Sequence, residues 1–404
     1  MPTTRGTQLG LLSFAMVLGM TPWFSATVAA PAMLVEWGAG GATSTWLTMA
    51  VQLGFVTGTC VSALFLLSDR WSARRLAGGS AMLAAVSTAL LALDGIRPAS
   101  AILLRAVTGF ALAGVYPPGI KLAAGWWRER RGTAIGVLIG ALTLGSASPN
   151  LFRLVDVGDW RTIVLLAAAA CLVAGVVFLV GVREGPYQAP SAPFDPRALG
   201  RVVRERGVVL ATAGYLGHMW ELYAVWSSLP IFWASVAERR GLAEDAAPLL
   251  AFATIASGAI GCVVAGIIAD RVGRATVTIW AMAASGLCSA VIGSLIGAPF
   301  LLLLTVALIW GATVVADSAQ FSACITEVAP PAYVGTAVTL QTCLGFLLTT
   351  ASIRLVPLLA SRWGWERAYI PLAIGPVLGI IAMARLRIDS GRADAERSAP
   401  VAAA

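Results

Sequence analysis

Long apolar runs alternate with short polar segments along almost the whole chain. A helix needs about 20 apolar residues to cross the hydrocarbon core of a bilayer, and these runs reach that length. A membrane β-barrel would show alternating strands of about 10 residues instead, and these runs are too long and too uniformly apolar. The pattern predicts an all-α integral membrane protein with twelve transmembrane helices. The expected spans are 9–34, 44–67, 76–94, 99–122, 132–154, 161–182, 207–236, 247–269, 275–296, 299–326, 333–357 and 367–386.

The longest polar connection covers residues 183–206 and is rich in proline and charge, without an apolar period. It is typical of a linker and divides the spans into two groups of six. We therefore expect two six-helix bundles with a linker between them and a tail at the end. The predicted divisions are 1–182 (first bundle), 183–206 (cytoplasmic linker), 207–388 (second bundle) and 389–404 (cytoplasmic tail).

The two predicted bundles repeat short motifs in register. Asp69-Arg70 follows the second expected span and Asp270-Arg271 follows the eighth. "RGTAIG" at 131–136 opens the fifth span, and "VGTAVT" at 334–339 opens the eleventh. Equivalent segments lie six spans apart, so both copies face the same side of the membrane. A parallel repeat about an axis along the membrane normal is typical of secondary transporters.

Composition supports a membrane location. The chain is 58% hydrophobic and 12% charged, whereas soluble domains carry about 25% charged residues. The basic residues form short clusters between apolar runs, which favours topology signals over a nucleic-acid surface. They concentrate in loops on one side, so we expect both termini to be cytoplasmic and the protein to lie in the inner (plasma) membrane.

Several functions are disfavoured by what the sequence does not contain. There is no Walker A motif and no G-x-S-x-G elbow, so neither ATP-driven transport nor a serine hydrolase is expected. The chain has one histidine and six cysteines, none of them in a CxxC pair, which falls short of a zinc ligand set. We expect no enzyme activity, cofactor, metal or nucleic-acid partner. We expect a monomer whose partners are the lipid bilayer, protons and a small-molecule substrate.

Five ionisable residues fall well inside the expected spans: Arg105, His218, Glu221, Asp317 and Arg354. Each costs about 2.5–3.5 kcal/mol at the centre of a span on insertion scales. Such residues normally face a cavity or a partner, so the set predicts a polar centre within the bundle.

His218 and Glu221 are separated by three positions and therefore share one face of the seventh span. Burial disfavours the charged forms of both side chains, which suits groups that take up and release a proton. Glu221 is the first candidate for proton coupling, with His218 beside it and Asp317 as a second candidate. The alternative is a hydrogen-bonded structural pair.

The loop segment 266–274, "GIIADRVGR", resembles the loop motif of the major facilitator superfamily, and the resemblance covers essentially the whole chain. The resemblance implies a fold of two six-helix bundles in which spans 1, 4, 7 and 10 line a central cavity. It also implies a conformational role for Gly266, Asp270, Arg271, Gly273 and Arg274. The first copy, with Asp69 and Arg70, is expected to share this role although it is degenerate: Phe65, Ser72 and Ala73 replace family residues.

The resemblance extends to two further spans. "RAVTG" at 105–109 is similar to the second family motif, which implies that Arg105 takes part in proton handling. The glycines of the fifth span match the family's antiporter motif only in part, because its Gly-Pro pair is missing. Their four-residue spacing nevertheless allows close helix packing.

These features predict a proton-coupled transporter that works by alternating access. Arginines that face the cavity favour a small organic or inorganic anion, with Arg354 as a binding residue and Trp23 and Trp220 as pocket walls. The alternative is an exporter of hydrophobic compounds. A membrane sensor without transport is a third class, disfavoured because no signalling domain is attached.

Overall fold

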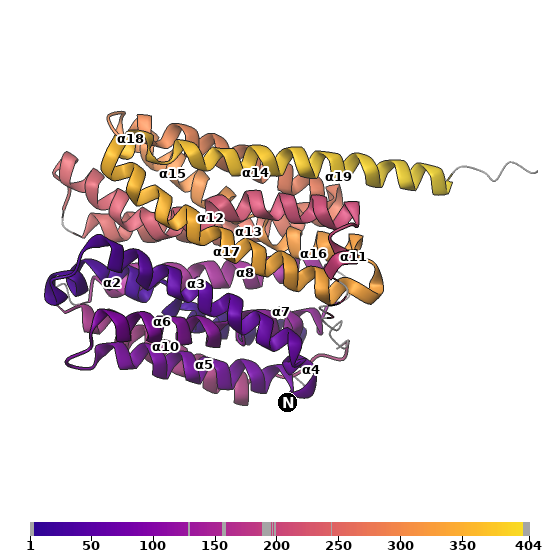
Figure 1. Ribbon diagram of the computed structural model, residues 1–404, viewed down its shortest axis with the longest axis horizontal. Helices are drawn as coiled ribbons and strands as arrows, with labels where there is room; N and C mark the ends of the chain where they lie inside the picture. The colour runs from indigo at the N-terminus through magenta and orange to yellow at the C-terminus, as the bar shows by residue number, and fades with distance from the viewer. Residues whose placement is uncertain are drawn as a thin grey trace, which may run out of the picture.

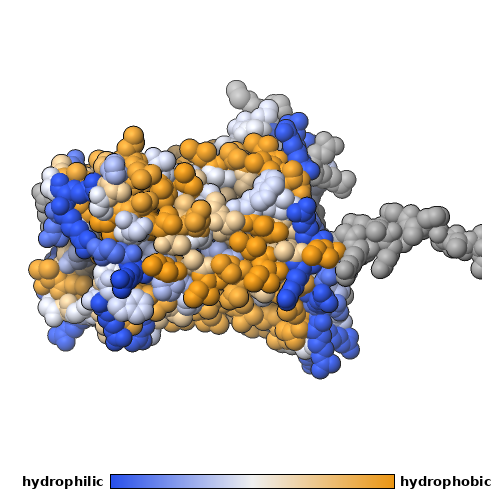
Figure 2. All heavy atoms as spheres, turned by 90° about the horizontal axis from the view of Figure 1, so that it is seen from above, coloured by the Kyte–Doolittle hydropathy of each residue, from blue (hydrophilic) through white to orange (hydrophobic). Residues whose placement is uncertain are grey.

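The computed structural model describes residues 4–127, 130–155, 159–187, 195, 197, 199–243 and 245–398. These residues form helices and connecting segments, and no β-strand occurs in them. Eleven helices of this part are long and apolar enough to cross a membrane. Figure 2 shows an apolar band on the visible face between two hydrophilic rims, as a bilayer requires. The prediction of an all-α membrane protein is therefore confirmed.

The first six spans form one bundle, the lower half of Figure 1. The first, fourth and fifth spans each consist of two consecutive helical segments, and the third span ends in a 3₁₀ turn. The segments are α1 (Arg5–Met20) with α2 (Pro22–Trp37), α3 (Gly41–Leu64), α5 (Ala73–Ala89) with η1 (Leu90–Ala92), α6 (Pro98–Leu112) with α7 (Tyr116–Ala124), α8 (Arg131–Ala147) with α9 (Pro149–Phe152), and α10 (Trp160–Val180). The short α4 (Leu67–Arg70) follows α3.

The second bundle repeats this order in the upper half of Figure 1. It is preceded by the short α11 (Leu199–Val202) and contains the short η4 (Pro331–Tyr333) and α18 (Trp365–Ala368). Its main helices are α12 (Arg206–Arg240), α13 (Ala246–Val272), α14 (Arg274–Val291) with η3 (Ile292–Leu295), α15 (Phe300–Val314) with α16 (Ser318–Val328), α17 (Val334–Trp363), and η5 (Ile370–Ala373) with α19 (Ile374–Ser398).

α12 is not among the eleven apolar helices, although its 35 residues are more than enough to cross a bilayer. Its middle carries His218, Trp220 and Glu221, which make it less apolar than its neighbours. The predicted number of twelve spans includes this helix, and that number remains a prediction.

Spans four and ten break at equivalent positions. α6 ends at Leu112 and α7 starts at Tyr116, while α15 ends at Val314 and α16 starts at Ser318. The first span also breaks, at Pro22, because proline cannot donate the backbone hydrogen bond that a continuous helix needs. The breaks at the same point of both bundles support the internal repeat read from the sequence.

The two bundles meet along α8 and α13. A Cβ atom added to Gly136 would lie 2.6 Å from the carbonyl oxygen of Cys262, and one added to Gly266 would lie 2.7 Å from that of Gly132. Such contacts leave no room for a side chain, so glycine is needed at this crossing. The predicted close packing of the fifth span is confirmed, and its partner is the eighth span of the other bundle.

The linker and tail differ in how far the structure describes them. Of the predicted linker, residues 188–194, 196 and 198 lie outside the described residues. α19 continues to Ser398, beyond the predicted end of the last span at 386, because this segment contains many good helix formers and no proline. The start of the predicted tail is therefore helical.

Candidate functional site

A cavity of about 620 Å³ lies between the two bundles. Its walls come from the second, fourth, fifth, seventh, tenth and eleventh spans, and it reaches one end of the bundle, where Lys121, Tyr187, Arg274 and Glu327 line it. Most of its polar groups are hydroxyls. In addition to Tyr187, its wall contains several aromatic rings. The hydroxyl-bearing side chains of serine and threonine are Thr59, Ser62, Ser318, Ser322, Thr326, Thr339 and Thr342; the rings are Phe55, Tyr116, Tyr215, Tyr223, Trp226 and Phe346.

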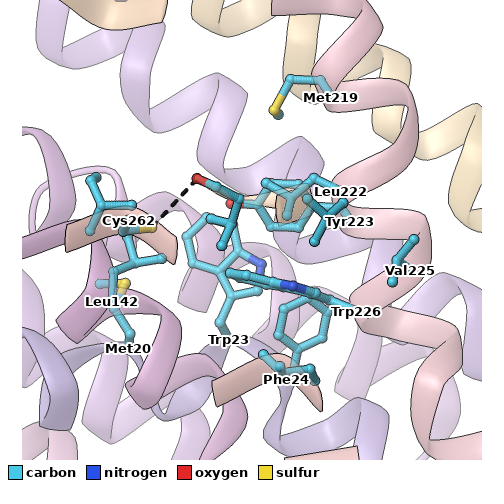
Figure 3. Packing of buried hydrophobic residues seen from close by; sticks show 14 of the residues in the cluster. Met20, Trp23, Phe24, Leu142, Met219, Leu222, Tyr223, Val225, Trp226 and Cys262 are labelled. Atoms are coloured by element: carbon cyan, nitrogen blue, oxygen red, sulfur yellow. Dashed lines mark hydrogen bonds between the residues drawn. The ribbon is translucent and has the colours of Figure 1, made fainter. Parts of the chain in front are cut away.

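Aromatic rings from both bundles pack against one another at the inner end of the cavity; Figure 3 shows Trp23, Phe24, Tyr223 and Trp226 among them. Trp23 and Phe24 of α2 face Tyr223 and Trp226 of α12, with ring centroids 5.6 Å apart for Trp23–Tyr223 and 6.1 Å for Phe24–Trp226. Phe346 of α17 lies 5.2 Å from the Tyr223 ring. Aromatic pairs at these distances stabilise one another beyond simple burial. We call Trp23, Phe24, Tyr223, Trp226 and Phe346 the aromatic layer.

His218 of α12 is buried beside the cavity and contacts two consecutive residues at the start of α16 in the tenth span. Its Nδ1 atom lies 2.8 Å from Oδ1 of Asp317, which is ion-pair distance, and its Nε2 atom lies 2.8 Å from Oγ of Ser318. Asp317 is the residue that precedes α16, so the pair is located at the break of the span. Ser318 lines the cavity. A single hydroxyl therefore separates the cavity from a buried His–Asp pair.

Glu221 is buried one turn further along α12, but it points away from the cavity. Its carboxylate accepts hydrogen bonds from Ser285 Oγ (2.8 Å) and Trp310 Nε1 (2.7 Å), which belong to α14 and α15. The two residues do not pair with each other, because His218 turns to Asp317 and Glu221 to these donors. The alternative reading, a hydrogen-bonded pair of His218 with Glu221, is thus not what the structure has; each residue has its own partners.

Arg105 is completely buried in the first bundle and does not line the cavity. Its guanidinium donates hydrogen bonds to the carbonyl oxygens of Pro22 (2.8 Å), Trp23 and Leu47. It holds α6 against α2 and α3 near the break of the first span. In this conformation its partners are backbone carbonyls, and no acidic side chain of the described part lies at ion-pair distance from it.

The three residues expected to bind substrate lie outside the cavity wall. Trp23 packs against the wall residues Tyr223 and Phe346 without lining the cavity itself, and Trp220 donates a hydrogen bond to the carbonyl of Pro371 (3.2 Å). Arg354 has an exposed side chain on α17 and does not line the cavity. The reason is the same for each: the span was predicted, but the face that it turns inward was not. Their binding roles remain predictions.

The loop motif joins the bundles at the end where the cavity opens. The carboxylate of Asp270 accepts hydrogen bonds from the backbone N–H (3.3 Å) and hydroxyl (3.1 Å) of Thr133, in the first turn of α8. Arg274 instead pairs with Glu327 (2.6 Å) and donates to Gln320 (3.1 Å) within the second bundle. Gly273 has a φ of +86°, which favours glycine at this turn. The carboxylate of Asp270 is placed to bridge the bundles.

The remaining residues of the loop motif and of its first copy lie in different surroundings. Gly266 packs against α8, whereas Arg70 and Arg271 are exposed. The side chain of Asp69 lies outside the described residues. The conformational role of the motif therefore remains a prediction for both copies.

Sequence reasoning missed most of the cavity wall. Tyr116, Tyr223, Trp226 and Phe346 were not identified, because aromatic residues in an apolar helix do not stand out from the residues around them. One signal was present: Ser318, Ser322 and Thr326 recur every four residues in the tenth span and so form a polar stripe on one helical face.

No group of three potential metal ligands lies together within the described residues. All six cysteines are free, and the thiols of Cys60 and Cys343 lie 3.2 Å apart at the contact of α3 with α17. The ring-lined cavity has room for an organic molecule, and the His218–Asp317 contact beside it consists of two groups that can carry a proton.

Comparison with known proteins agrees with this geometry. The family model described as Major Facilitator Superfamily matches residues 12–353. The MFS-type transporter pytF of Aspergillus terreus (strain NIH 2624 / FGSC A1156) is 26% identical over 171 residues, which are 41% of this chain. The chain spans about half of that relative, 55% of its length.

Among solved structures, the fold is similar to that of the proton:xylose symporter XylE bound to 6-bromo-6-deoxy-D-glucose. The TM-score is 0.71, with 95% of this chain and 96% of the other covered, at 14% sequence identity. The likeness concerns the fold alone, an all-helical membrane protein. With a family model that matches most of its length, the chain belongs to the major facilitator superfamily.

Proposed function

We propose that this protein is a secondary active transporter that moves a small organic molecule by alternating access and couples the movement to protons. The observation that carries the proposal is the His218–Asp317 contact at the break of the tenth span, one hydroxyl away from the cavity. A buried pair of this kind can gain or lose a proton only if solvent or substrate reaches it. In this conformation the cavity provides that access through Ser318.

The cavity supports an alternating-access cycle in which this conformation is open at one end. The aromatic layer closes the end where α2 meets α12, and α7 and α16 form opposite walls at the other end. For release on the other side, the aromatic layer must part while α7 and α16 approach. The break between α15 and α16 lies next to Asp317, so a change of charge there acts on a hinge.

Proton coupling has an analogy in the fold. XylE, whose structure is similar, is a proton:xylose symporter. For this chain, the coupling residues we propose are Asp317 and His218. Glu221, which the sequence favoured, is placed as a second buried acid without a direct contact to the cavity.

The wall of the cavity favours a hydrophobic compound over the small anion expected from the sequence. An anion site needs a cationic side chain that points into the cavity. In the described wall, the only cations are Lys121 and Arg274, both at the mouth; Arg274 is paired with Glu327 and Lys121 also has a partner. The inner part offers rings and hydroxyls, which suit an aromatic molecule with a few hydrogen-bonding groups.

Orientation and location complete the proposal. The basic loops place both termini on the cytoplasmic side of an inner (plasma) membrane. The cavity mouth lies at the same end as the start of α12 and the end of α19, so this conformation faces the cytoplasm. We propose that the protein works as a monomer.

The substrate class is testable with purified protein in proteoliposomes. Lipophilic aromatic compounds should bind in the cavity, whereas small organic and inorganic anions should not. The Trp226→Ala variant should weaken binding of such a compound by roughly tenfold or more, since it removes a large ring from the wall. Trp280→Ala, an exposed tryptophan on α14, is the matched control and should change nothing. Saturable transport of a small anion, unaffected by Trp226→Ala, would contradict this substrate class.

A further inference from the structure

A second hollow of about 580 Å³ lies in the first bundle and shares no lining residue with the central cavity. It is located where α5 begins and α10 ends, and its walls are Ser72, Arg74, Arg75, Val180, Arg183 and Glu184. These helices pack tightly: a Cβ atom added to Gly78 would lie 3.0 Å from the carbonyl oxygen of Gly175. The hollow thus opens at the end of a rigid helix pair.

The hollow carries an excess of positive charge. Three arginines surround it and one acid, Glu184, belongs to its wall, which leaves a formal charge of about +2. Within the described part of the chain, no acidic side chain lies at ion-pair distance from any of the three arginines. The hydroxyl of Ser72 is also buried without a hydrogen-bond partner. Together these groups form a cluster of donors suited to an anion.

Two of the arginines are held in position. Nη1 of Arg74 donates a hydrogen bond to the carbonyl of Leu179 (3.0 Å). The backbone N–H of Arg183 donates to Oε1 of Gln8 (2.8 Å), and its carbonyl accepts from Nε1 of Trp126 (2.9 Å). The side chain of Arg74 and the backbone at Arg183 are therefore held in place, while the side chains of Arg75 and Arg183 are exposed.

The surface next to the hollow is apolar and faces outward. Leu172, Val176 and Val180 follow one another at four-residue spacing on α10, and 47%, 47% and 77% of their respective side-chain surfaces are exposed. Leu83 and Val86 of α5 are exposed on the neighbouring helix. Val180 belongs to both the apolar stripe and the hollow, so the two surfaces are continuous.

The position of this surface along the bundle is that of a membrane interface. Trp71, beside Ser72, is 61% exposed, and exposed tryptophans are enriched at the level of lipid headgroups. Basic pockets between membrane helices on the cytoplasmic side are known to bind acidic headgroups. An anion attached to two long apolar chains matches both parts of the surface.

We propose that this hollow binds an anionic phospholipid, with its phosphodiester between Arg75, Arg183 and the Ser72 hydroxyl and its acyl chains along α5 and α10. The excess charge favours a lipid with net negative charge over a zwitterionic one. Glu184 is placed to accept a hydrogen bond from a headgroup hydroxyl, as in a glycerol headgroup. This inference is independent of the transport function.

The test is a lipid titration of the full-length protein in detergent, read by thermal melting and by native mass spectrometry. Phosphatidylglycerol should raise the melting temperature saturably and remain as a bound adduct, whereas phosphatidylcholine and phosphatidylethanolamine should not. The double variant Arg75→Gln/Arg183→Gln should bind phosphatidylglycerol about thirtyfold more weakly, about fivefold for each arginine.

The matched control is Arg385→Gln/Arg387→Gln, two exposed arginines in the middle of α19 that line neither hollow. It should keep the affinity of the wild type. An equal loss in this control would reduce the effect to general surface charge and overturn the proposal. The same stabilisation by millimolar inorganic phosphate, or by phosphatidylethanolamine, would overturn it as well. Should the double variant melt early without lipid, Arg75→Gln alone gives the same comparison.

Discussion

Replacing Asp317 by asparagine should abolish proton-driven accumulation of substrate while exchange of substrate across the membrane continues. Asparagine keeps the shape of the side chain beside His218 but cannot ionise. With a pH gradient of one unit and one proton per substrate, the wild type should accumulate substrate about tenfold. The variant should reach a ratio of about one. Accumulation and counterflow of substrate in proteoliposomes measure the two properties separately.

Two further variants make this result specific. Glu366→Gln removes an exposed acid that pairs with Arg239 at the opposite end of the same bundle, and it should retain tenfold accumulation. Glu221→Gln should also retain coupling, since that carboxylate contacts Ser285 and Trp310 rather than the cavity wall. If Glu221→Gln uncouples transport and Asp317→Asn does not, Glu221 is the coupling residue, as the sequence favoured, and the assignment to Asp317 is wrong.

The Gly136→Leu variant should lose both stability and transport, because there is no space for a side chain between α8 and α13. The added Cβ atom would lie 2.6 Å from the carbonyl oxygen of Cys262, and a backbone carbonyl cannot move without its helix. Overpacking costs about 1–3 kcal/mol and occasionally more. We expect a melting temperature lower by several degrees and transport close to background.

Gly79→Leu is the control for the same chemical change. Gly79 is exposed on α5, and a Cβ atom there would have no neighbour within 4 Å. Leucine is also the better helix former, so this variant should melt at or above the temperature of the wild type and transport normally. Equal melting temperatures for the two variants would show that the crossing of α8 and α13 is not tight in the membrane.

The spans could be read from the sequence because the bilayer imposes a strong rule. Every backbone polar group in the hydrocarbon must be satisfied within a helix, so apolar runs of sufficient length become helices. The repeat was readable because Asp69-Arg70 and Asp270-Arg271 keep their places after equivalent spans. Break positions were harder. Pro22 marks the first and Pro117 and Pro118 follow the second directly, but no proline marks the break between Val314 and Ser318.

The contacts of the site could not be read, because they depend on how each helix is rotated. An almost uniformly apolar helix gives little information about which face turns inward. His218 and Asp317 were both identified as buried charges, yet their contact joins positions 99 residues apart in the sequence. Arg354 was assigned to the right span, but the structure places its side chain on an exposed face.

Coupling at the His218–Asp317 pair is tested most sharply by the proton movement that substrate itself causes. Proteoliposomes with weakly buffered interiors and no initial pH gradient should show a change in internal pH when a transported aromatic compound is added. We expect this change in the wild type and its absence in Asp317→Asn. Substrate flux in the wild type without any pH change, under conditions that detect one proton per substrate, would contradict proton coupling.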